Sequence, residues 1–135
     1  MGKFLWSNGE KLTHEFTFIA HHIFDHYLDQ LLENDPALKK SYEKQIDLIK
    51  TNPYIGSPMK YAPSDIAGRV YKKKMGGRSG YSICYIIFRE IKVVLGVYIT
   101  PEARKDIDYR KFPWEKLTQA VKDFNAKDLE KFRIV

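Results

Sequence analysis

The chain has 135 residues, 44% of them hydrophobic and 14% aromatic, and a formal net charge of +6. This length predicts a single domain over residues 1–135, and no apolar run approaches the roughly 18 residues that a membrane span requires. The N-terminus lacks the apolar segment of a signal peptide, and the single cysteine, Cys84, cannot form an internal disulfide. We therefore expect a soluble cytoplasmic protein, and the positive charge favours an anionic partner.

The N-terminal part predicts a strand that leads into a helix. Residues 1–13 form an extension in which Asn8-Gly9 is typical of a hairpin turn, with a possible extra strand over residues 3–7. Alternating Phe and polar residues predict the strand over about residues 14–19. Apolar residues then recur at helical spacing over about residues 21–33.

A second helix is predicted directly after the first. Asp35 is a favourable N-cap residue, and Pro36 takes the first helical position, where its missing N–H group has no bond to lose. The helix should run to about Lys50, because Asn52-Pro53 ends it. The short joint makes the two helices an antiparallel hairpin.

Residues 68–100 predict three antiparallel strands in a meander. The segments GRVYKKKM, YSICYIIF and IKVVLGVYIT are rich in Val, Ile, Tyr and Phe, and short joints with Gly or charged residues separate them. The middle strand, Tyr81–Phe88, is apolar at both parities, which is typical of a central strand covered on both faces. The residues expected to share one core are Leu28, Leu31, Ile46, Ile83, Tyr85, Ile87, Val93 and Leu95.

The same meander concentrates the positive charge. From Ile66 to Arg89, both included, there are six basic residues and no acidic one. Alternation along the strand places Lys72 and Lys74 on one face of the sheet and Lys73 on the other. Because two lysines occupy one face, we expect the helices to pack on the opposite face and to leave a basic surface partly exposed at a sheet edge.

The C-terminal part predicts one more helix. Pro113 opens it, and Trp114, Leu117, Val121 and Phe124 form its apolar stripe. The predicted fold class is therefore α+β, with an antiparallel sheet, the element order β-α-α-β-β-β-α and a helical hairpin on one face.

These segments, in this order, resemble the RelE/ParE toxin superfamily of bacterial type II toxin–antitoxin systems. The similarity is carried by THEFTFI, ENDPALKKSYEKQIDLIKTNPYIGSPMK, GRVYKKKMGGRSGYSICYIIF and VYITPEARKDIDY, and it spans about residues 14–124. The glycine-rich GGRSGY joint is most similar to the RelE and HigB branches. The resemblance implies a toxin that cleaves ribosome-bound mRNA without a metal or other cofactor, inhibits translation and is bound by a cognate antitoxin protein.

The resemblance also implies the catalytic residues. Lysines at alternate positions of the second family strand match Lys72 and Lys74, and a late tyrosine matches Tyr109. A basic residue after the last strand matches Arg104 or Lys105.

This chain departs from the family at the residue that binds the scissile phosphate. The family has an arginine where this chain has Ser82, and Arg78 on the preceding joint is the nearest replacement. The residues expected to bind RNA beside the catalytic group are Arg69, Lys73, Tyr81 and Lys105.

RNA cleavage without a metal requires a base for the 2′-hydroxyl, cations for the phosphate and an acid for the leaving oxygen. No histidine follows His26, so lysine, arginine and tyrosine must fill these roles near the meander. A lysine serves as a base where neighbouring cations lower its pKa. The structural alternative is that the lysines form a solvated strand edge that prevents aggregation.

Two further interpretations remain open. A non-enzymatic protein of the same fold would inhibit DNA gyrase or only bind its antitoxin, and the serine at position 82 favours that function class. His22 and His26 have the spacing of two metal ligands on one helix face, but no cysteine or acidic residue forms a matching third ligand in the sequence, so we predict no metal site.

Overall fold

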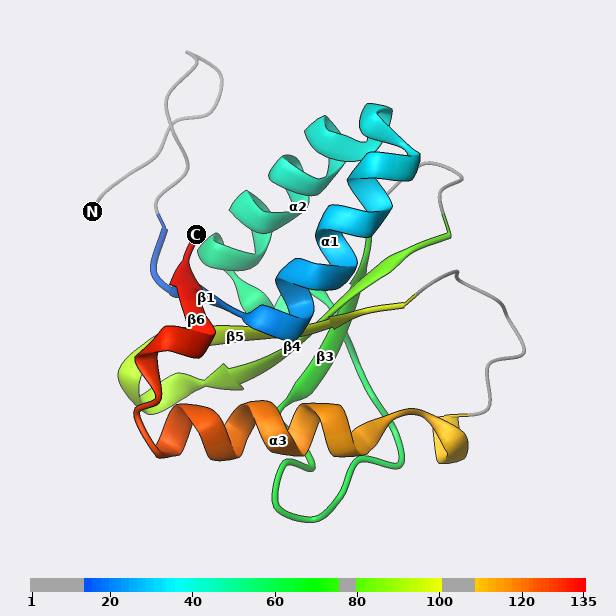
Figure 1. Cartoon of the computed structure of the whole chain (residues 1–135). Coiled ribbons are helices and arrows are strands. Elements are labelled where there is room, and N and C mark those ends of the chain that lie inside the picture. Colours follow the sequence, from blue (N-terminus) through cyan, green and yellow to red (C-terminus); the bar gives the residue numbers. More distant parts are fainter. Residues whose placement is uncertain (1–13, 76–79, 101–108) are drawn as a thin grey trace.

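The structure is a computed structural model that describes residues 14–75, 80–100 and 109–135. Within these residues a six-stranded sheet lies between helices on both of its faces, an α+β arrangement (Figure 1). The strands follow the order β2-β3-β4-β5-β1-β6 across the sheet. Their bounds are β1 Thr17–His21, β2 Ser57–Pro58, β3 Val70–Lys74, β4 Ser82–Phe88, β5 Val93–Ile99 and β6 Phe132–Ile134.

The sheet is mixed rather than wholly antiparallel. Strands β3, β4 and β5 form the predicted antiparallel meander, with β4 between the other two. Strand β1, however, pairs with β5 in parallel, with Thr17 opposite Val93. The prediction of an antiparallel sheet was therefore wrong for β1. A parallel pair needs a long crossover connection, which the two helices and the meander supply here.

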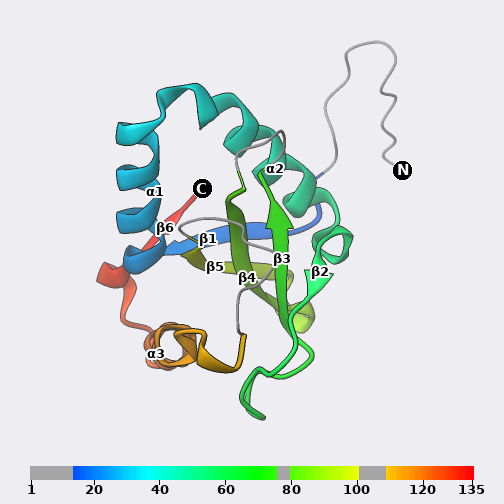
Figure 2. The ribbon, with the colours of Figure 1, turned by 90° about the vertical axis from the view of Figure 1, so that its right-hand side faces the viewer.

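Two short strands that the sequence did not predict complete the sheet. Strand β2 pairs antiparallel with β3, placing Ser57 opposite Lys72, and Figure 2 shows the two side by side. Strand β6 pairs antiparallel with β1 at the other end of the sheet. The prediction that Lys72 lies on an exposed edge of the sheet was therefore wrong, because β2 covers β3 at this residue. The possible extra strand at residues 3–7 lies outside the described residues.

The predicted helical hairpin is confirmed on one face of the sheet (Figure 2). Phe24, Leu28 and Leu31 form the buried stripe of the first helix. A 3-10 turn at Pro36–Leu38 opens the second helix, but the Asp35 side chain makes no capping hydrogen bond. None of the described helices is both long and apolar enough to cross a bilayer. The helices are α1 His22–Asn34, α2 Lys39–Thr51 and α3 Trp114–Asn125.

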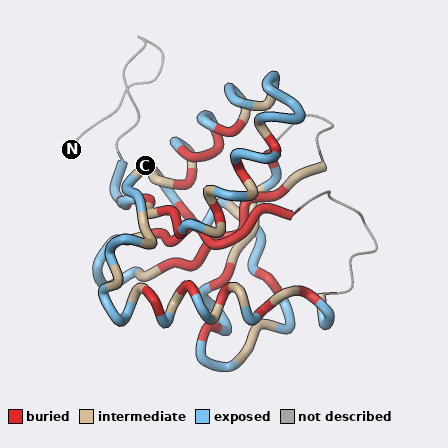
Figure 3. The backbone as a smooth tube through the Cα atoms, viewed as in Figure 1, coloured by how far each residue is buried: buried red, intermediate tan, exposed pale blue. Residues whose placement is uncertain are grey.

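Helix α3 packs on the face opposite the hairpin, so the prediction that all helices share one face was wrong (Figure 1). The reason is that β4 and β5 present apolar side chains, such as Ile86, on this second face as well. Leu117 and Ala120 of α3 cover them and are fully buried. Figure 3 shows buried segments in the sheet and on helices at both sides of it.

The sheet thus separates two apolar cores. Of the eight residues expected in one core, six share the core under α1 and α2. Leu95 instead pairs with Ile86 and packs in the core under α3, while Val93 is only half-buried. The β4–β5 joint is longer than predicted, because Arg89–Ile91 forms a 3-10 turn before β5. The six residues are Leu28, Leu31, Ile46, Ile83, Tyr85 and Ile87.

Replacing Gly96 by alanine is expected to lower the free energy of unfolding by about 1–3 kcal/mol. An added Cβ would lie 2.6 Å from two ring atoms of Phe18 and 3.3 Å from Phe24. Urea denaturation followed by circular dichroism measures the loss. The loss should shrink in a Phe18→Leu background, which removes those ring atoms. An equal loss in both backgrounds would contradict the proposed contact.

Candidate functional site

Lys72 and Tyr109 are in contact, although 37 positions separate them in the sequence. The Lys72 ammonium donates a 2.5 Å hydrogen bond to the Tyr109 hydroxyl oxygen, and its nitrogen lies 4.4 Å from the centre of that ring. Both side chains are half-buried. The bond uses one of three ammonium N–H donors and leaves the phenolic O–H to donate elsewhere. The pair therefore offers several donors, one of them charged, to a single anionic ligand.

The C-terminal helix fixes the position of Tyr109. The indole N–H of Trp114, the first residue of α3, donates a 2.8 Å hydrogen bond to the backbone carbonyl of Tyr109. The Tyr109 ring also lies 5.7 Å from the Phe112 ring, which in turn contacts Tyr98 of β5 at 5.3 Å. These contacts hold the hydroxyl in place before any ligand binds, as electrostatic stabilisation of a reacting group requires.

The neighbouring strands fix the position of Lys72. It lies opposite Cys84 of β4 on one side and Ser57 of β2 on the other. An added Cβ on Gly56 would lie 2.7 Å from the Lys72 carbonyl oxygen, so only glycine lets the loop approach β3 here. Burial raises the pKa of the Cys84 thiol to about 12, and the positive charge of Lys72 opposes this only in part. Cys84 is therefore a protonated core residue, not a nucleophile.

A cavity of about 190 Å³ opens beside this pair. Lys60 and Tyr61 reach it from the loop that precedes β3, and both are exposed. The sequence did not identify these two residues, because nothing in their spacing relates them to Lys72. The full lining is Pro58, Met59, Lys60, Tyr61, Lys72 and Tyr109.

The other predicted catalytic residues are only partly described. Lys74 pairs with Ser82 across the β3–β4 ladder, so it lies on the same face as Lys72, and it is exposed. Ser82 itself is buried, and its backbone N–H donates to the Thr100 hydroxyl at 2.9 Å. The position of the family's arginine thus holds no cation. Arg78, Arg104 and Lys105 lie outside the described residues.

The remaining predicted RNA-binding residues are not gathered at this cavity. Lys73 follows Lys72 along β3, so its side chain lies on the opposite face of the sheet. This is the face covered by α1 and α2, where Tyr71 and Met75 pack. Tyr81 also packs against the core on that face, beside α1. Arg69 is exposed and precedes β3 at its far end, next to Ile87.

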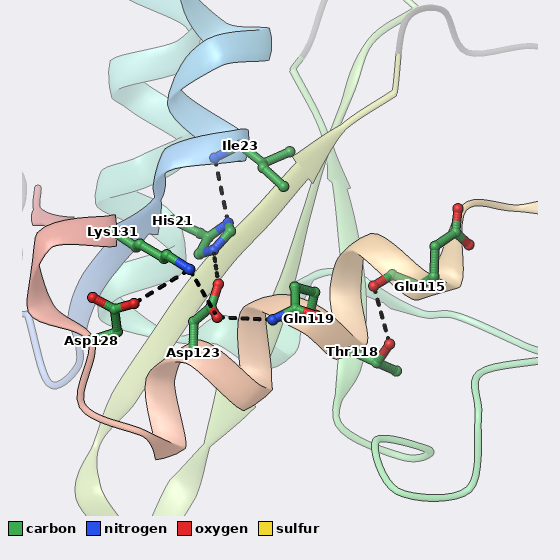
Figure 4. A network of polar contacts seen from close by, with 8 residues as sticks. All are labelled: His21, Ile23, Glu115, Thr118, Gln119, Asp123, Asp128 and Lys131. Atoms are coloured by element: carbon green, nitrogen blue, oxygen red, sulfur yellow. Dashed lines mark hydrogen bonds and ion pairs between the residues drawn. The ribbon is translucent and has the colours of Figure 1, made fainter.

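A second polar cluster, which the sequence did not predict, joins β1 to α3 (Figure 4). His21 is fully buried, and its Nε2 lies 2.8 Å from an Asp123 carboxylate oxygen. The other carboxylate oxygen accepts from Gln119 at 2.9 Å and from Lys131 at 3.5 Å. The backbone N–H of Ile23 donates to His21 Nδ1 at 3.4 Å, which assigns the ring proton to Nε2.

This cluster also contains the one candidate set of metal ligands among the described residues, His21, His22 and Asp123, within 4.8 Å of one another. His22 therefore lies near two other potential ligands, whereas His26, four positions further along α1, does not belong to the set. However, both ring nitrogens of His21 and both oxygens of Asp123 already have partners, and Lys131 is one of them. We interpret the cluster as a structural link between β1 and α3.

The free energy of unfolding is expected to fall as the pH is lowered from about 7. Burial lowers the pKa of His21 below its ordinary value of 6.5, and the bond from His21 lowers the pKa of Asp123 below 3.8. The unfolded chain therefore takes up protons on both groups more readily than the folded protein, so acid favours unfolding, first below about pH 6.5. Urea denaturation across pH 4–8 measures this. His21→Gln should lose the part of the pH dependence above pH 5, whereas exposed His26→Gln should keep it. An identical pH profile for all three proteins contradicts the assignment.

An apolar cavity of about 530 Å³ lies elsewhere, between the end of α3 and β6, lined by residues such as Phe124, Phe132 and Ile134. It is larger than the cavity at Lys72, but it lacks a gathering of cations and hydroxyl groups. We therefore place the candidate site at Lys72, Lys74 and Tyr109, because these groups can bind an anion. The sequence matches no model of a known protein family, and it matches no curated protein.

Proposed function

We propose that this protein is a metal-independent endoribonuclease that cleaves ribosome-bound mRNA, a toxin of the RelE/ParE type. The observation that carries the proposal is the contact between Lys72 and Tyr109, two of the residues that the family resemblance assigns to catalysis. The order of the two helices and the β3–β4–β5 meander is also compatible with such a fold.

The geometry supports phosphate binding over the solvated-edge interpretation. A lysine that only keeps a strand edge soluble would extend into water, but Lys72 is half-buried, flanked by β2 and bonded to Tyr109. Lys74, on the same face of β3, adds a second positive charge. Two cations and a fixed hydroxyl suit the negative charge that develops on a phosphate during cleavage.

In the proposed reaction the RNA 2′-oxygen attacks the adjacent phosphorus and the bond to the 5′-oxygen breaks. Of Lys72 and Lys74, one accepts the 2′-hydroxyl proton as a neutral amine, and the other stabilises the charge on the phosphate as an ammonium group. Tyr109 donates a proton to the leaving 5′-oxygen. The products are a 2′,3′-cyclic phosphate and a 5′-hydroxyl end, with no oxidant, metal or external nucleophile consumed.

A small acidic antitoxin is the expected partner. It would cover the Lys72 and Lys74 face and neutralise the site by charge and by occlusion, as segments that fold on binding do. Co-expression with a protein encoded next to this one, followed by pull-down, tests the pairing. A protein that is harmless alone and retains no neighbouring gene product would count against the toxin assignment.

The second candidate function is non-enzymatic inhibition of DNA gyrase or simple antitoxin binding. The buried Ser82, in place of a phosphate-binding arginine, favours it. Purified protein separates the two functions when it is added to a translation extract and to a gyrase supercoiling assay. We expect shortened mRNA in the first and unchanged supercoiling in the second. The reverse pattern would replace the ribonuclease with the inhibitor.

A further inference from the structure

Tyr61 combines an unfavourable backbone conformation with an exposed aromatic ring. Its φ angle is +69°, in the left-handed region that a bulky side chain rarely adopts. The residue is 62% exposed, and among the described residues no other ring contacts its side chain. A turn at this point would be more favourable with Gly or Asn. Backbone strain of this kind concentrates at functional sites, where the side chain's position has a use.

The place where this ring lies gives it a use. Tyr61 lines the cavity of about 190 Å³ that also contains Lys72 and Tyr109. Buried Met59 gives this cavity an apolar lining, and exposed Lys60 lies next to the ring in the sequence. Cations beside an exposed aromatic ring are the arrangement with which proteins bind single-stranded nucleic acid, because every base has a face that can stack.

We propose that Tyr61 is the stacking platform for one nucleobase of a single-stranded RNA, which enters this cavity when the adjacent phosphate binds Lys72. The inference rests on the proposed function in that the phosphate lies at Lys72. It adds a binding subsite that recognises the base rather than the phosphate. An aromatic face binds any base, so the subsite orients the strand and adds affinity without reading a strict sequence.

The charge of the surroundings favours an anionic ligand over an apolar protein segment, and the size of the cavity favours a single nucleotide over a helical segment. The cavity is small and is bounded by Lys60 and Lys72, so it fits a planar ring with an attached phosphate better than a helix. In this turn only Tyr61 has the left-handed conformation, so the turn orients a single aromatic ring. Stacking of a single base requires one such ring.

The test uses a short single-stranded RNA with 2′-O-methyl groups, which cannot be cut, and 2-aminopurine at successive positions. The proteins are the parent, Tyr61→Phe, Tyr61→Asn and Lys72→Ala. Asparagine tolerates the left-handed conformation, so Tyr61→Asn removes the ring and keeps the turn. Binding is followed by the quenching of 2-aminopurine fluorescence, which stacking on an aromatic ring causes.

We expect Tyr61→Asn to weaken binding about 5- to 150-fold and to abolish the quenching at one position, because stacking of one base supplies that much affinity. Tyr61→Phe should bind like the parent. Tyr61→Asn should keep the salt dependence of binding, whereas Lys72→Ala should reduce it by about one phosphate contact. Tyr61→Asn should also unfold at a urea concentration at least as high as the parent, because asparagine relieves the backbone strain at this turn.

An abasic nucleotide at the quenched position gives the matched control. With it, the parent and Tyr61→Asn should bind equally. The inference is overturned if Tyr61→Asn binds the intact RNA as tightly as the parent, or if Tyr61→Phe binds as weakly as Tyr61→Asn. If base binding depends on Tyr61 but the parent cuts no mRNA, the proposed ribonuclease fails and the base site remains. If mRNA is cut and Tyr61→Asn changes nothing, the base site fails alone.

Discussion

Replacing Lys72 or Lys74 by alanine is expected to slow mRNA cleavage about 100- to 1000-fold, equivalent to about 2.7–4 kcal/mol of transition-state stabilisation. Both side chains lie on the same face of β3, and Lys72 is held by Tyr109. Removing either leaves the developing charge on the phosphate with one cation fewer in a site where positions are fixed. The measurement is the initial rate of mRNA cleavage in a translation extract.

Lys73→Ala is the matched control for these two variants. It removes the same charge from the same strand, but its side chain lies on the face covered by the helical hairpin. Its rate should stay close to that of the parent. Circular dichroism spectra and urea denaturation are used to check that all three variants are folded. If Lys72→Ala and Lys74→Ala cut as fast as Lys73→Ala, the lysines are not part of the catalytic site.

Leu117→Ala is expected to lower the free energy of unfolding by about 2–5 kcal/mol. Leu117 is fully buried between α3 and the second face of the sheet, in the same core as Ile86 and Leu95. Truncation removes several methyl groups and leaves a cavity that the rigid strands of the sheet fill only partly. Urea denaturation followed by circular dichroism gives the change in stability.

The neighbouring Lys116→Ala provides the comparison, because Lys116 is only half-buried and substitutions outside a core usually change stability by less than about 0.5 kcal/mol. Equal stabilities for Leu117→Ala and Lys116→Ala would mean that α3 does not cover the sheet. This outcome would also remove the support for Tyr109, whose backbone is held by the first residue of α3.

Local patterns in the sequence were sufficient to predict the meander and its faces. Both parities of β4 are apolar, and β4 does lie inside the sheet with a core on each side. Alternation along β3 correctly separated Lys72 and Lys74 from Lys73, because the side-chain period of a strand depends only on its own backbone. The hairpin of α1 and α2 followed equally from helical spacing and from the proline at the joint.

Features that depend on distant segments were not predictable in this way. The parallel direction of β1 follows from where the chain returns to the sheet, and no local pattern records it. The expectation that α3 would join the hairpin assumed that two lysines make a whole face polar. Most of that face belongs to β4 and β5, which are apolar there.

In the candidate site, too, local patterns predicted only part of the arrangement. The contact between Lys72 and Tyr109 joins segments that lie 37 positions apart in the sequence, and only the family resemblance suggested both residues. The left-handed conformation of Tyr61 had no signal at all, because the position carries neither Gly nor Asn. The buried pair of His21 and Asp123 was missed for a further reason, since each residue alone is ordinary for its element.

Lys72, Lys74 and Tyr109 are the residues that we propose to form a centre for RNA cleavage. The most direct test of this proposal is to add purified parent protein to a translation extract and to determine the chemistry of the new mRNA ends. We expect cleavage that yields 2′,3′-cyclic phosphate and 5′-hydroxyl ends. Lys72→Ala should lower its rate at least 100-fold, which corresponds to about 2.7 kcal/mol of transition-state stabilisation. Uncut mRNA, together with inhibition of gyrase supercoiling by the same preparation, would contradict it.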